Sequence, residues 1–385
     1  MQRLQQRALL IGLVALTLCI IGAFFSPAQF FRSYLLAYTY WLGVALGCLA
    51  IVMMYHLTGG AWGVATRRLL EAATRTLPLM ILLFVPVAFG ISDLYVWAHP
   101  EAVAGDELLQ HKAVYLNVPF FLVRAALYFL AWCGIAYFLN KWSLEQDQRG
   151  ADPQPTRKMQ ILSGPGLVVY FLTFTFAAVD WLMSLEPHWY STIFAAVLMM
   201  GQGINAFALV IIAGALLTDR RPLAEVLTPA HFQALAGLLL SFVMLWAYMA
   251  FSQWLLIWSG NLPEENFWYV HRLSGGWKWV GLLLIVVHFA LPFLLLLSRD
   301  LKRNARALSA VAATLMVMRL IDIFWIIVPT FHPTGFYLHW MDVIAPIGLG
   351  GIWLAVFTSQ LGERPLVPQH DPNLQEALAY GHERH

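Results

Sequence analysis

Ten stretches of apolar residues, each about 20 residues long, dominate the sequence and restrict its fold more than any other feature. A stretch of this length crosses the hydrocarbon core of a bilayer as an α-helix, which satisfies its own backbone hydrogen bonds. Charged residues make up only 11% of the chain, against about 25% in an ordinary soluble domain. The sequence therefore predicts an all-α integral membrane protein and excludes a separate soluble catalytic domain.

The predicted helices leave only short connections, so residues 1–361 are expected to form one polytopic transmembrane domain. The polar residues 362–385, which contain three prolines, are expected to be an extended cytoplasmic tail that lies on other subunits, or a disordered one. An even number of helices places both termini on one side of the membrane. The ten helices are predicted at 8–25, 34–56, 77–97, 117–139, 164–185, 191–217, 231–258, 276–298, 305–328 and 340–361.

The basic residues give this topology an orientation. The side with both termini holds 17 of the 23 Lys and Arg residues, the opposite loops hold four, and two lie within helices. Because cytoplasmic loops carry an excess of Lys and Arg, both termini are predicted to be cytoplasmic. The net charge is only +2 and the basic residues are scattered, so nucleic acid is not expected as a partner.

The residue types that bind metals and haem are sparse. Cys19, Cys48 and Cys133 lie in separate apolar stretches without a C-x-x-C spacing. His288 is the one histidine in the middle of a predicted helix, whereas a transmembrane haem b needs two imidazoles on facing helices. We therefore expect that this chain alone binds no haem, no metal and no iron–sulfur cluster.

Charged side chains inside the predicted helices are candidates for a proton path. Each costs about 2.5 kcal/mol or more in hydrocarbon, so each should face the protein interior, a water cavity or a partner. The acids outnumber the bases, and a buried carboxyl near its switching point suits a proton relay. The candidates are Asp93, Arg124, Asp180, Arg319, Asp322 and Asp342, with His288 as a further proton carrier.

Simpler interpretations of these residues stay open. Arg319 and Asp322 are three residues apart, so they share a helix face and can form a purely structural ion pair. Asp180 lies on a polar stripe with Thr173 and Ser184, which predicts either a water chain or ordinary hydrogen bonds between helices. Among the carboxyls, Asp180 and Asp342 are the preferred candidates for proton exchange.

A second polar group points to a small-molecule pocket or to helix packing. Gln202 and Asn205 share one helix face, and Tyr248 and Gln253 lie at middle depth on the next predicted helix. These side chains are expected to line a quinone headgroup pocket, to line a proton wire, or to hydrogen-bond between helices. The sequence does not separate the three interpretations.

One long segment, DWLMSLEPHWYSTIF at residues 180–194, has an unusual composition. Together with further motifs, it resembles the ActF family, the second NrfD-like membrane subunits of bacterial alternative complex III, a quinol:cytochrome c oxidoreductase. The further motifs are Trp246-Ala247-Tyr248 with Phe251-Ser252-Gln253, Gly260 to Glu265, Tyr269 to Arg272 before Gly275-Gly276-Trp277, Arg319 to Asp322, Phe331-His332-Pro333, and His339 to Asp342.

The resemblance implies a fold and a role. It implies an NrfD-like fold of two four-helix bundles plus two extra helices in the bacterial cytoplasmic (inner) membrane. Haem c and iron–sulfur clusters would lie in partner subunits, and this chain would carry no catalytic residues of its own. The implied role is assembly, with a proton path coupled to quinol oxidation. The implied partners are an ActC-like NrfD subunit, an iron–sulfur subunit, multihaem cytochromes c, small membrane subunits, lipids and a terminal cytochrome oxidase.

Two other functions remain as alternatives at this point. The chain could bind and oxidise quinol directly, through residues such as Gln202, Asn205 and Tyr248. It could also be an independent secondary transporter, in which intramembrane Asp and Arg residues would form the substrate site. A transporter is expected to purify alone, whereas an ActF-like subunit is expected to purify with haem-containing partners.

Overall fold

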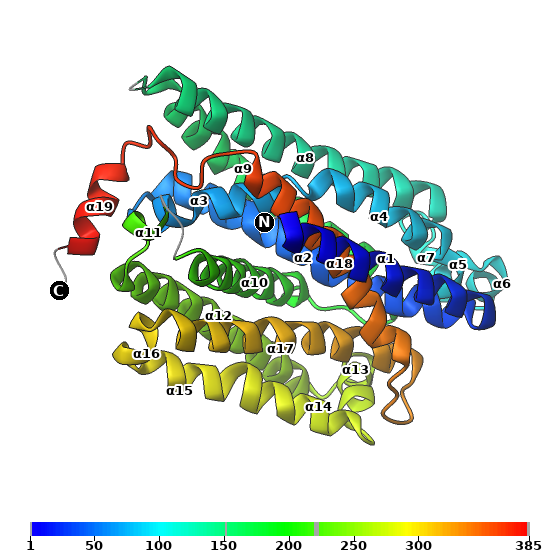
Figure 1. The fold of residues 1–385 in the computed structure, drawn as a ribbon. Helices are drawn as coiled ribbons and strands as arrows, with labels where there is room; N and C mark the ends of the chain where they lie inside the picture. The colour runs from blue at the N-terminus through cyan, green and yellow to red at the C-terminus, as the bar shows by residue number, and fades with distance from the viewer. Residues whose placement is uncertain (1, 151, 219–222, 383–385) are drawn as a thin grey trace.

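The computed structural model describes residues 2–150, 152–218 and 223–382, and within these ranges it contains helices and no strands. Ten helical segments are long and apolar enough to cross a membrane, which confirms the predicted all-α fold. Figure 1 shows the long helices running side by side. The ten segments are Gln2–Phe25, Pro27–Thr58, Ala61–Phe89, Val118–Arg149, Gln154–Leu185, Phe194–Leu217, Pro229–Gly260, Trp277–Leu297, Ala305–Phe331 and Trp340–Gly362.

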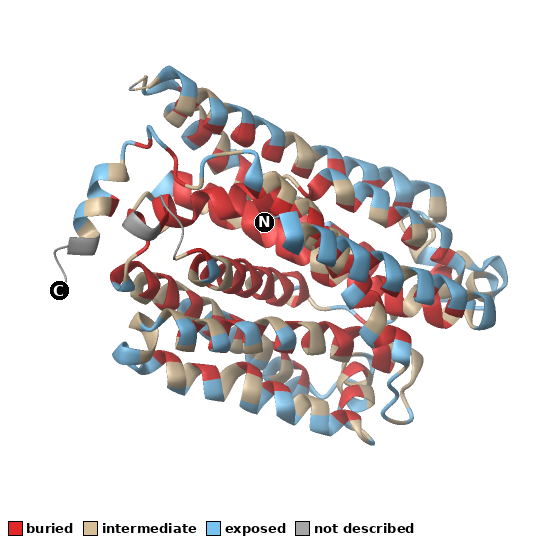
Figure 2. Ribbon diagram, viewed as in Figure 1, coloured by how far each residue is buried: buried red, intermediate tan, exposed pale blue. Residues whose placement is uncertain are grey.

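Four consecutive spans pack together as the first bundle (Figure 1). Its members are α2 (Pro27–Thr58), α3 (Ala61–Thr74) continued by α4 (Leu77–Phe89), α8 (Val118–Arg149) and α9 (Gln154–Trp181). Most of α2 is buried, and it contacts α3, α4 and α9. Figure 2 shows this helix as a buried element at the centre of the molecule. An apolar helix that is buried all round belongs to the core of a bundle.

The second bundle is formed by the next four spans. These are α10 (Phe194–Leu217), α12 (Pro229–Gly260), the span made of α14 (Trp277–Leu283), η3 (Leu284–Ala290) and α15 (Leu291–Leu297), and α17 (Ala305–Phe331). The buried helix α10 contacts α2, so these two helices join the bundles. The arrangement agrees with the expectation of two four-helix bundles.

The remaining two helices, α1 (Gln2–Phe25) and α18 (Trp340–Gly362), form a close pair against α2. Glycines permit the approach: a Cβ added at Gly12 would lie 2.7 Å from the backbone nitrogen of Ile352, and one at Gly351 would lie 2.5 Å from the Cα of Gly12. Small residues that let two backbones touch are typical of membrane helix interfaces. The extra helices are therefore held by backbone contact.

The connections lie at two ends of the bundle. We call the end with both described chain termini and the connecting residues 59–60, 152–153, 227–228 and 298–304 the basic end, and the other the distal end. The distal end carries the short helices α5 (Ile91–Leu94), η1 (Val96–Ala98), α6 (Pro100–Ala104), α7 (Glu107–Lys112) and α13 (Pro263–Leu273). The basic end carries α11 (Leu223–Val226), α16 (Arg299–Arg303) and α19 (Leu374–His382).

The third span corrects the sequence-based prediction of a helix at 77–97. The span begins at Ala61 and ends at Phe89, where Gly90 follows, so Asp93 lies in the short helix α5 beyond the span. The first part of the span, α3, holds Arg67, Arg68 and Glu71, and these charges made it resemble a loop in the sequence. They are buried because they pair with one another.

The C-terminal tail also differs from its prediction as an extended or disordered segment. Residues 374–382 form α19, which packs against α3, α11 and α12. Asp371 precedes this helix and forms an ion pair with Arg67 at 2.7 Å. The tail therefore lies on its own bundle at the basic end; residues 383–385 fall outside the described chain.

Candidate functional site

A charged cluster lies in the middle of the second bundle. Arg319 and Asp322 on α17 form an ion pair and are 1% and 3% exposed. A Cβ added at Gly201 of α10 would overlap the guanidinium, so the arginine lies against the backbone of that helix. No other hydrogen bond of the Arg319 side chain is found within the described residues. Asp322 is thus the counter-ion that makes the buried guanidinium tolerable.

His288 lies beside this pair, in the π-helical turn η3. Its ring packs against Trp246 of α12 with centroids 4.2 Å apart and the ring planes tilted by 33°. Arg319 is close enough for its charge to act on the imidazole. Neither ring nitrogen makes a well-formed hydrogen bond to a described residue, although the backbone of Met318 is near. A buried imidazole with spare donor and acceptor capacity in a π-turn is typical of a functional position.

A line of three hydrogen-bonded polar side chains, Tyr269, Gln253 and Ser191, lies on the distal side of this cluster. The charge of Asp322 acts on the phenol of Tyr269 of α13, but no hydrogen bond joins these two side chains among the described residues. The Tyr269 hydroxyl accepts a hydrogen bond from Gln253 at 3.0 Å, and Gln253 accepts one from the half-buried Ser191 at 2.9 Å. Burial raises the pKa of Tyr269 to about 12, so its hydroxyl stays protonated and can both donate and accept.

The opposite direction along the same helices is apolar. From the cluster to the basic end, the buried residues of α17 are Leu308, Val311, Ala312, Leu315 and Met318. Those of α12 between His231 at its start and Trp246 are also apolar. Asn205 of α10 is buried on the basic side of the cluster, but its Oδ1 has no hydrogen-bond partner among the described residues. The hydrogen-bonded polar line of the second bundle therefore lies on the distal side.

The first bundle holds a second buried pair, between Arg124 of α8 and Asp180 of α9. Arg124 Nε and Nη2 donate to the two carboxylate oxygens at 2.8 and 2.9 Å, and Tyr128 donates to the same carboxylate at 2.7 Å. Asp180 is fully buried, and the guanidinium lies 3.8 Å from the centroid of the Tyr115 ring. Bidentate geometry with a third donor describes an ionised carboxylate that is held in place.

The polar stripe predicted around Asp180 resolves into local contacts. Thr173 accepts a hydrogen bond from Trp132 of α8 at 2.9 Å, and Ser184 donates to the backbone oxygen of Asp180 at 2.5 Å. These contacts match the interpretation as hydrogen bonds within and between helices.

The rest of the unusual segment 180–194 ties the two bundles together at the distal end. Glu186 accepts hydrogen bonds from Arg272 of α13 at 3.1 Å and from Thr330 of α17 at 2.6 Å. His188 pairs with Asp106 at 2.7 Å. Burial lowers the pKa of Arg272 to about 10, and the guanidinium remains charged at neutral pH.

Aromatic rings complete this connection. Trp189 stacks on Trp268 with ring centroids 4.5 Å apart. The Cζ atom of Arg272 lies 3.6 Å from the centroid of the Trp268 ring. The unusual composition of the segment is therefore explained by its contacts, because it connects α9 to α10 and its side chains bind residues of α13 and α17.

Asp342 lies apart from both ion pairs, at the distal start of α18. Its Oδ1 accepts hydrogen bonds from Ser33 at 2.5 Å and Gln29 at 3.1 Å, and its Oδ2 accepts one from the backbone of His339 at 2.9 Å. It caps its helix in this way, and no ion pair of Asp342 is found in the described chain. Asp93, in α5, is half-buried, and it lies near enough to Arg32 for electrostatic attraction between the two side chains.

The four quinone candidates do not meet in one pocket. Gln202 accepts from Tyr170 at 2.6 Å between the two bundles, and Asn205 is buried one turn further along α10. Gln253 lies near the distal end, as described above. Tyr248 is 67% exposed on the outer face of α12.

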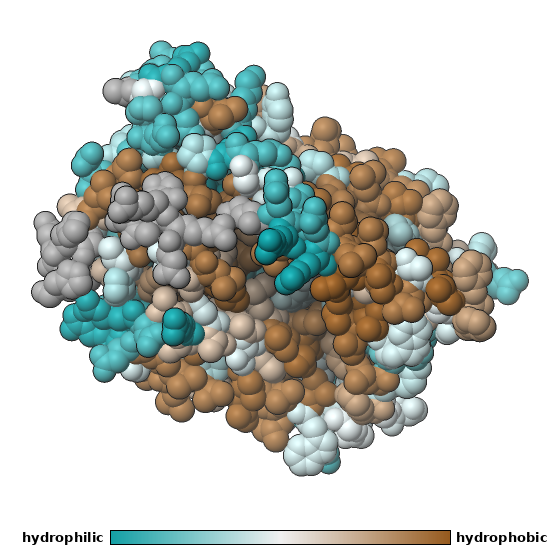
Figure 3. Space-filling view, in the orientation of Figure 1, coloured by the Kyte–Doolittle hydropathy of each residue, from teal (hydrophilic) through white to brown (hydrophobic). Residues whose placement is uncertain are grey.

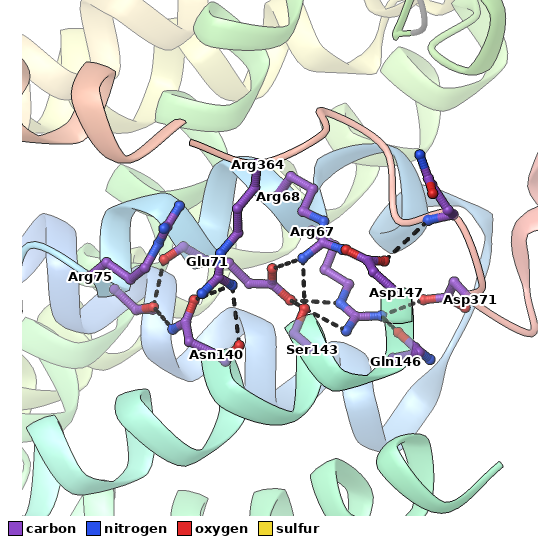
Figure 4. A network of polar contacts seen from close by, with 12 residues as sticks. Arg67, Arg68, Glu71, Arg75, Asn140, Ser143, Gln146, Asp147, Arg364 and Asp371 are labelled. Atoms are coloured by element: carbon purple, nitrogen blue, oxygen red, sulfur yellow. Dashed lines mark hydrogen bonds and ion pairs between the residues drawn. The ribbon is translucent and has the colours of Figure 1, made fainter. Parts of the chain in front are cut away.

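Sequence reasoning missed a buried network at the basic end (Figure 4). Arg67 donates to Glu71 at 2.7 Å and to Gln146 at 2.8 Å, and Arg68 donates to Glu71 at 2.8 Å and pairs with Asp147. Spacings of three and four residues within 67–71 could have revealed these pairs in a helix. The network includes Asp371 of the tail, so it fastens α3, α8 and the tail together.

Among the residues that the structure describes, no group of three or more His, Cys, Asp or Glu side chains could hold a metal ion. No protein-family model matches the chain, and no curated protein shows significant sequence similarity to it.

Proposed function

We propose that the chain is a non-catalytic integral subunit of an alternative complex III, which helps to couple quinol oxidation to proton movement. The observation that carries this proposal is the Arg319–Asp322 pair beside His288, in the middle of the second bundle. A charged side chain at this depth in a membrane costs free energy, and in membrane proteins such residues mark ion and proton pathways.

The direction of the polar line supports a half-path for protons. Tyr269, Gln253 and Ser191 lie between the cluster and the distal end and are joined by hydrogen bonds. On the basic side of the cluster, the buried residues of α12 and α17 are apolar apart from His231 at the start of α12. The proton-exchanging groups in this proposal are His288 and Asp322. Asp180 is better explained as an anchor, because its carboxylate is held by Arg124 and Tyr128.

The resemblance of segment 180–194 and the other motifs to the ActF family supports the identity of the complex. Haem c and iron–sulfur clusters would then belong to partner subunits, in the bacterial cytoplasmic membrane. The partners proposed are an ActC-like subunit, an iron–sulfur subunit and multihaem cytochromes c, as well as small membrane subunits and a terminal oxidase.

The proposed orientation places the basic end in the cytoplasm, because Lys and Arg residues concentrate there. Gln148 at the basic end and Gly105 at the distal end are both exposed. In a background with the half-buried Cys133 replaced by Ser, single cysteines at these two positions should react with an impermeant thiol reagent from opposite sides. The cysteine at position 105 should react in intact spheroplasts, and the cysteine at position 148 should react only in inverted vesicles. Labelling of both cysteines from one side would contradict the topology.

Purification from native membranes tests the identity of the complex. A tagged chain, extracted in mild detergent, should bring c-type haem with an absorption band that is reduced by a quinol analogue. A chain that purifies alone, without haem and with wild-type stability, would contradict the proposal and favour a transporter.

A further inference from the structure

An apolar cavity lies between the α1/α18 pair and the second bundle. Its volume is about 670 Å³, which falls within the range of small-molecule sites. Residues of α1, α2, α14, α17 and α18 line it, together with Phe336 and Leu338 of the distal connection. Apolar residues cover most of this face of the molecule (Figure 3). The cavity opens sideways, between helices that face the membrane.

The length of the cavity matches one leaflet of a bilayer. Its lining on α18 runs from Asp342 to Leu354, which corresponds to about 18 Å at the helical rise per residue. One leaflet of hydrocarbon is about 15 Å thick, and a transmembrane helix of a partner would need about 30 Å. The cavity therefore fits a lipid chain better than it fits a helix.

The distal end of the cavity offers one acidic group. Asp342 is 4% exposed and lines the cavity, and no cation pairs with it in the described chain. Its carboxylate accepts three hydrogen bonds, whereas a carboxylate can accept about four. It therefore retains capacity for a cationic donor that approaches from the cavity.

A basic group lies close to the acid. Arg32 is one helical turn before Leu36, which lines the cavity on α2, and so it lies on the same face of that helix. Its guanidinium is 4.4 Å from the centroid of the Phe331 ring, and its Nε has no hydrogen-bond partner among the described residues. Gln29 and Ser33, three residues before and one residue after Arg32 on α2, both donate to Asp342, so Arg32 and Asp342 share one neighbourhood. Asp93 of α5 also lies near enough to Arg32 for its charge to favour the protonated guanidinium.

We propose that this cavity binds one phospholipid with a phosphoethanolamine headgroup. Its acyl chain lies along α18, its ammonium group meets Asp342, and its phosphate meets Arg32. A carboxylate that lines the cavity and an Arg in the same neighbourhood match the two opposite charges of this headgroup. This site is independent of the proposed proton path, because it lies outside the second bundle on the face of α1 and α18.

Native mass spectrometry of the purified protein, with any copurifying partners, tests the proposal after exchange into equal amounts of phosphatidylethanolamine and phosphatidylglycerol. The wild type should retain one lipid per chain and prefer phosphatidylethanolamine. A hydrogen bond to a charged group contributes about 1.5–3 kcal/mol, which corresponds to a preference of about tenfold or more. Asp342→Asn should abolish the preference, and Arg32→Gln should weaken the binding of both lipids.

Filling the cavity provides the matched control. Ile347 and Val317 line the cavity and are 45% and 58% exposed, whereas Ile285 is 62% exposed on a face that does not line it. Ile347→Trp and Val317→Trp should each release the lipid, and Ile285→Trp should retain it. Retention in both filled variants, equal retention of the two lipids by the wild type, or a cross-link from Val343→Cys to a partner polypeptide would overturn the proposal.

Discussion

Replacement of Asp180 by Asn is expected to lower the free energy of unfolding by about 3–5 kcal/mol, because it leaves the Arg124 guanidinium buried without its counter-ion. Arg124 is only 7% exposed in its side chain, and Asp180 accepts both of its parallel hydrogen bonds. Arginine cannot lose its proton to relieve this state. We expect the variant to show reduced membrane accumulation and a reduced midpoint in denaturation by sodium dodecyl sulfate.

Three variants separate this effect from a general loss of contacts. Tyr128→Phe removes a single hydrogen bond to Asp180 and should cost about 1–3 kcal/mol. Arg149→Met breaks exposed pairs with Glu145 and Asp152 and should cost about 0–1 kcal/mol. The double variant Arg124→Met/Asp180→Leu should regain part of the stability, since it buries no charge. An Asp180→Asn protein as stable as Arg149→Met would refute the pairing.

Replacement of Asp322 by Asn is expected to have a comparable effect in the second bundle, and the effect should be asymmetric. Asp322→Asn leaves Arg319 without a counter-ion and should cost about 3–5 kcal/mol. Arg319→Met leaves a carboxyl that can become neutral by taking up a proton, so this variant should be less destabilised. Denaturation of both purified variants measures the difference, and equal losses would contradict the asymmetry.

The contact between Arg319 and Gly201 gives this prediction an internal control. Gly201→Ala should cost about 1–3 kcal/mol in the wild type, because the new Cβ would overlap the guanidinium. In the Arg319→Met background the flexible thioether can move aside, so Gly201→Ala should cost much less. Additive losses would show that the guanidinium does not lie against α10.

The number of spans could be predicted from the sequence because a membrane-spanning helix is recognised by its length and apolar composition. The Arg319–Asp322 pair could also be predicted, since three residues along a helix bring two side chains together. The Arg124–Asp180 pair could not, because it joins two helices across 56 residues and depends on how α8 and α9 pack.

The positions of α3, Asp93 and Tyr248 could not be predicted from the sequence, for different physical reasons. Segment α3 carries buried charges whose favourable pairing is invisible to a hydropathy pattern. Conversely, Asp93 was placed in a helix because apolar residues continue after Gly90, where the span ends. Tyr248 was grouped with Gln253 by depth, although depth along a helix does not fix which face a side chain takes.

The ratio of protons moved to electrons transferred, measured in liposomes that contain the purified complex, tests the central claim most directly. His288→Gln removes the titrating ring and Tyr269→Phe removes the hydroxyl of the polar line, and neither leaves a buried charge unpaired. Both variants are predicted to keep wild-type haem content and to lose proton movement per electron, while Tyr248→Phe on the outer face behaves as the wild type. A wild-type ratio in both His288→Gln and Tyr269→Phe would contradict a proton path through this chain.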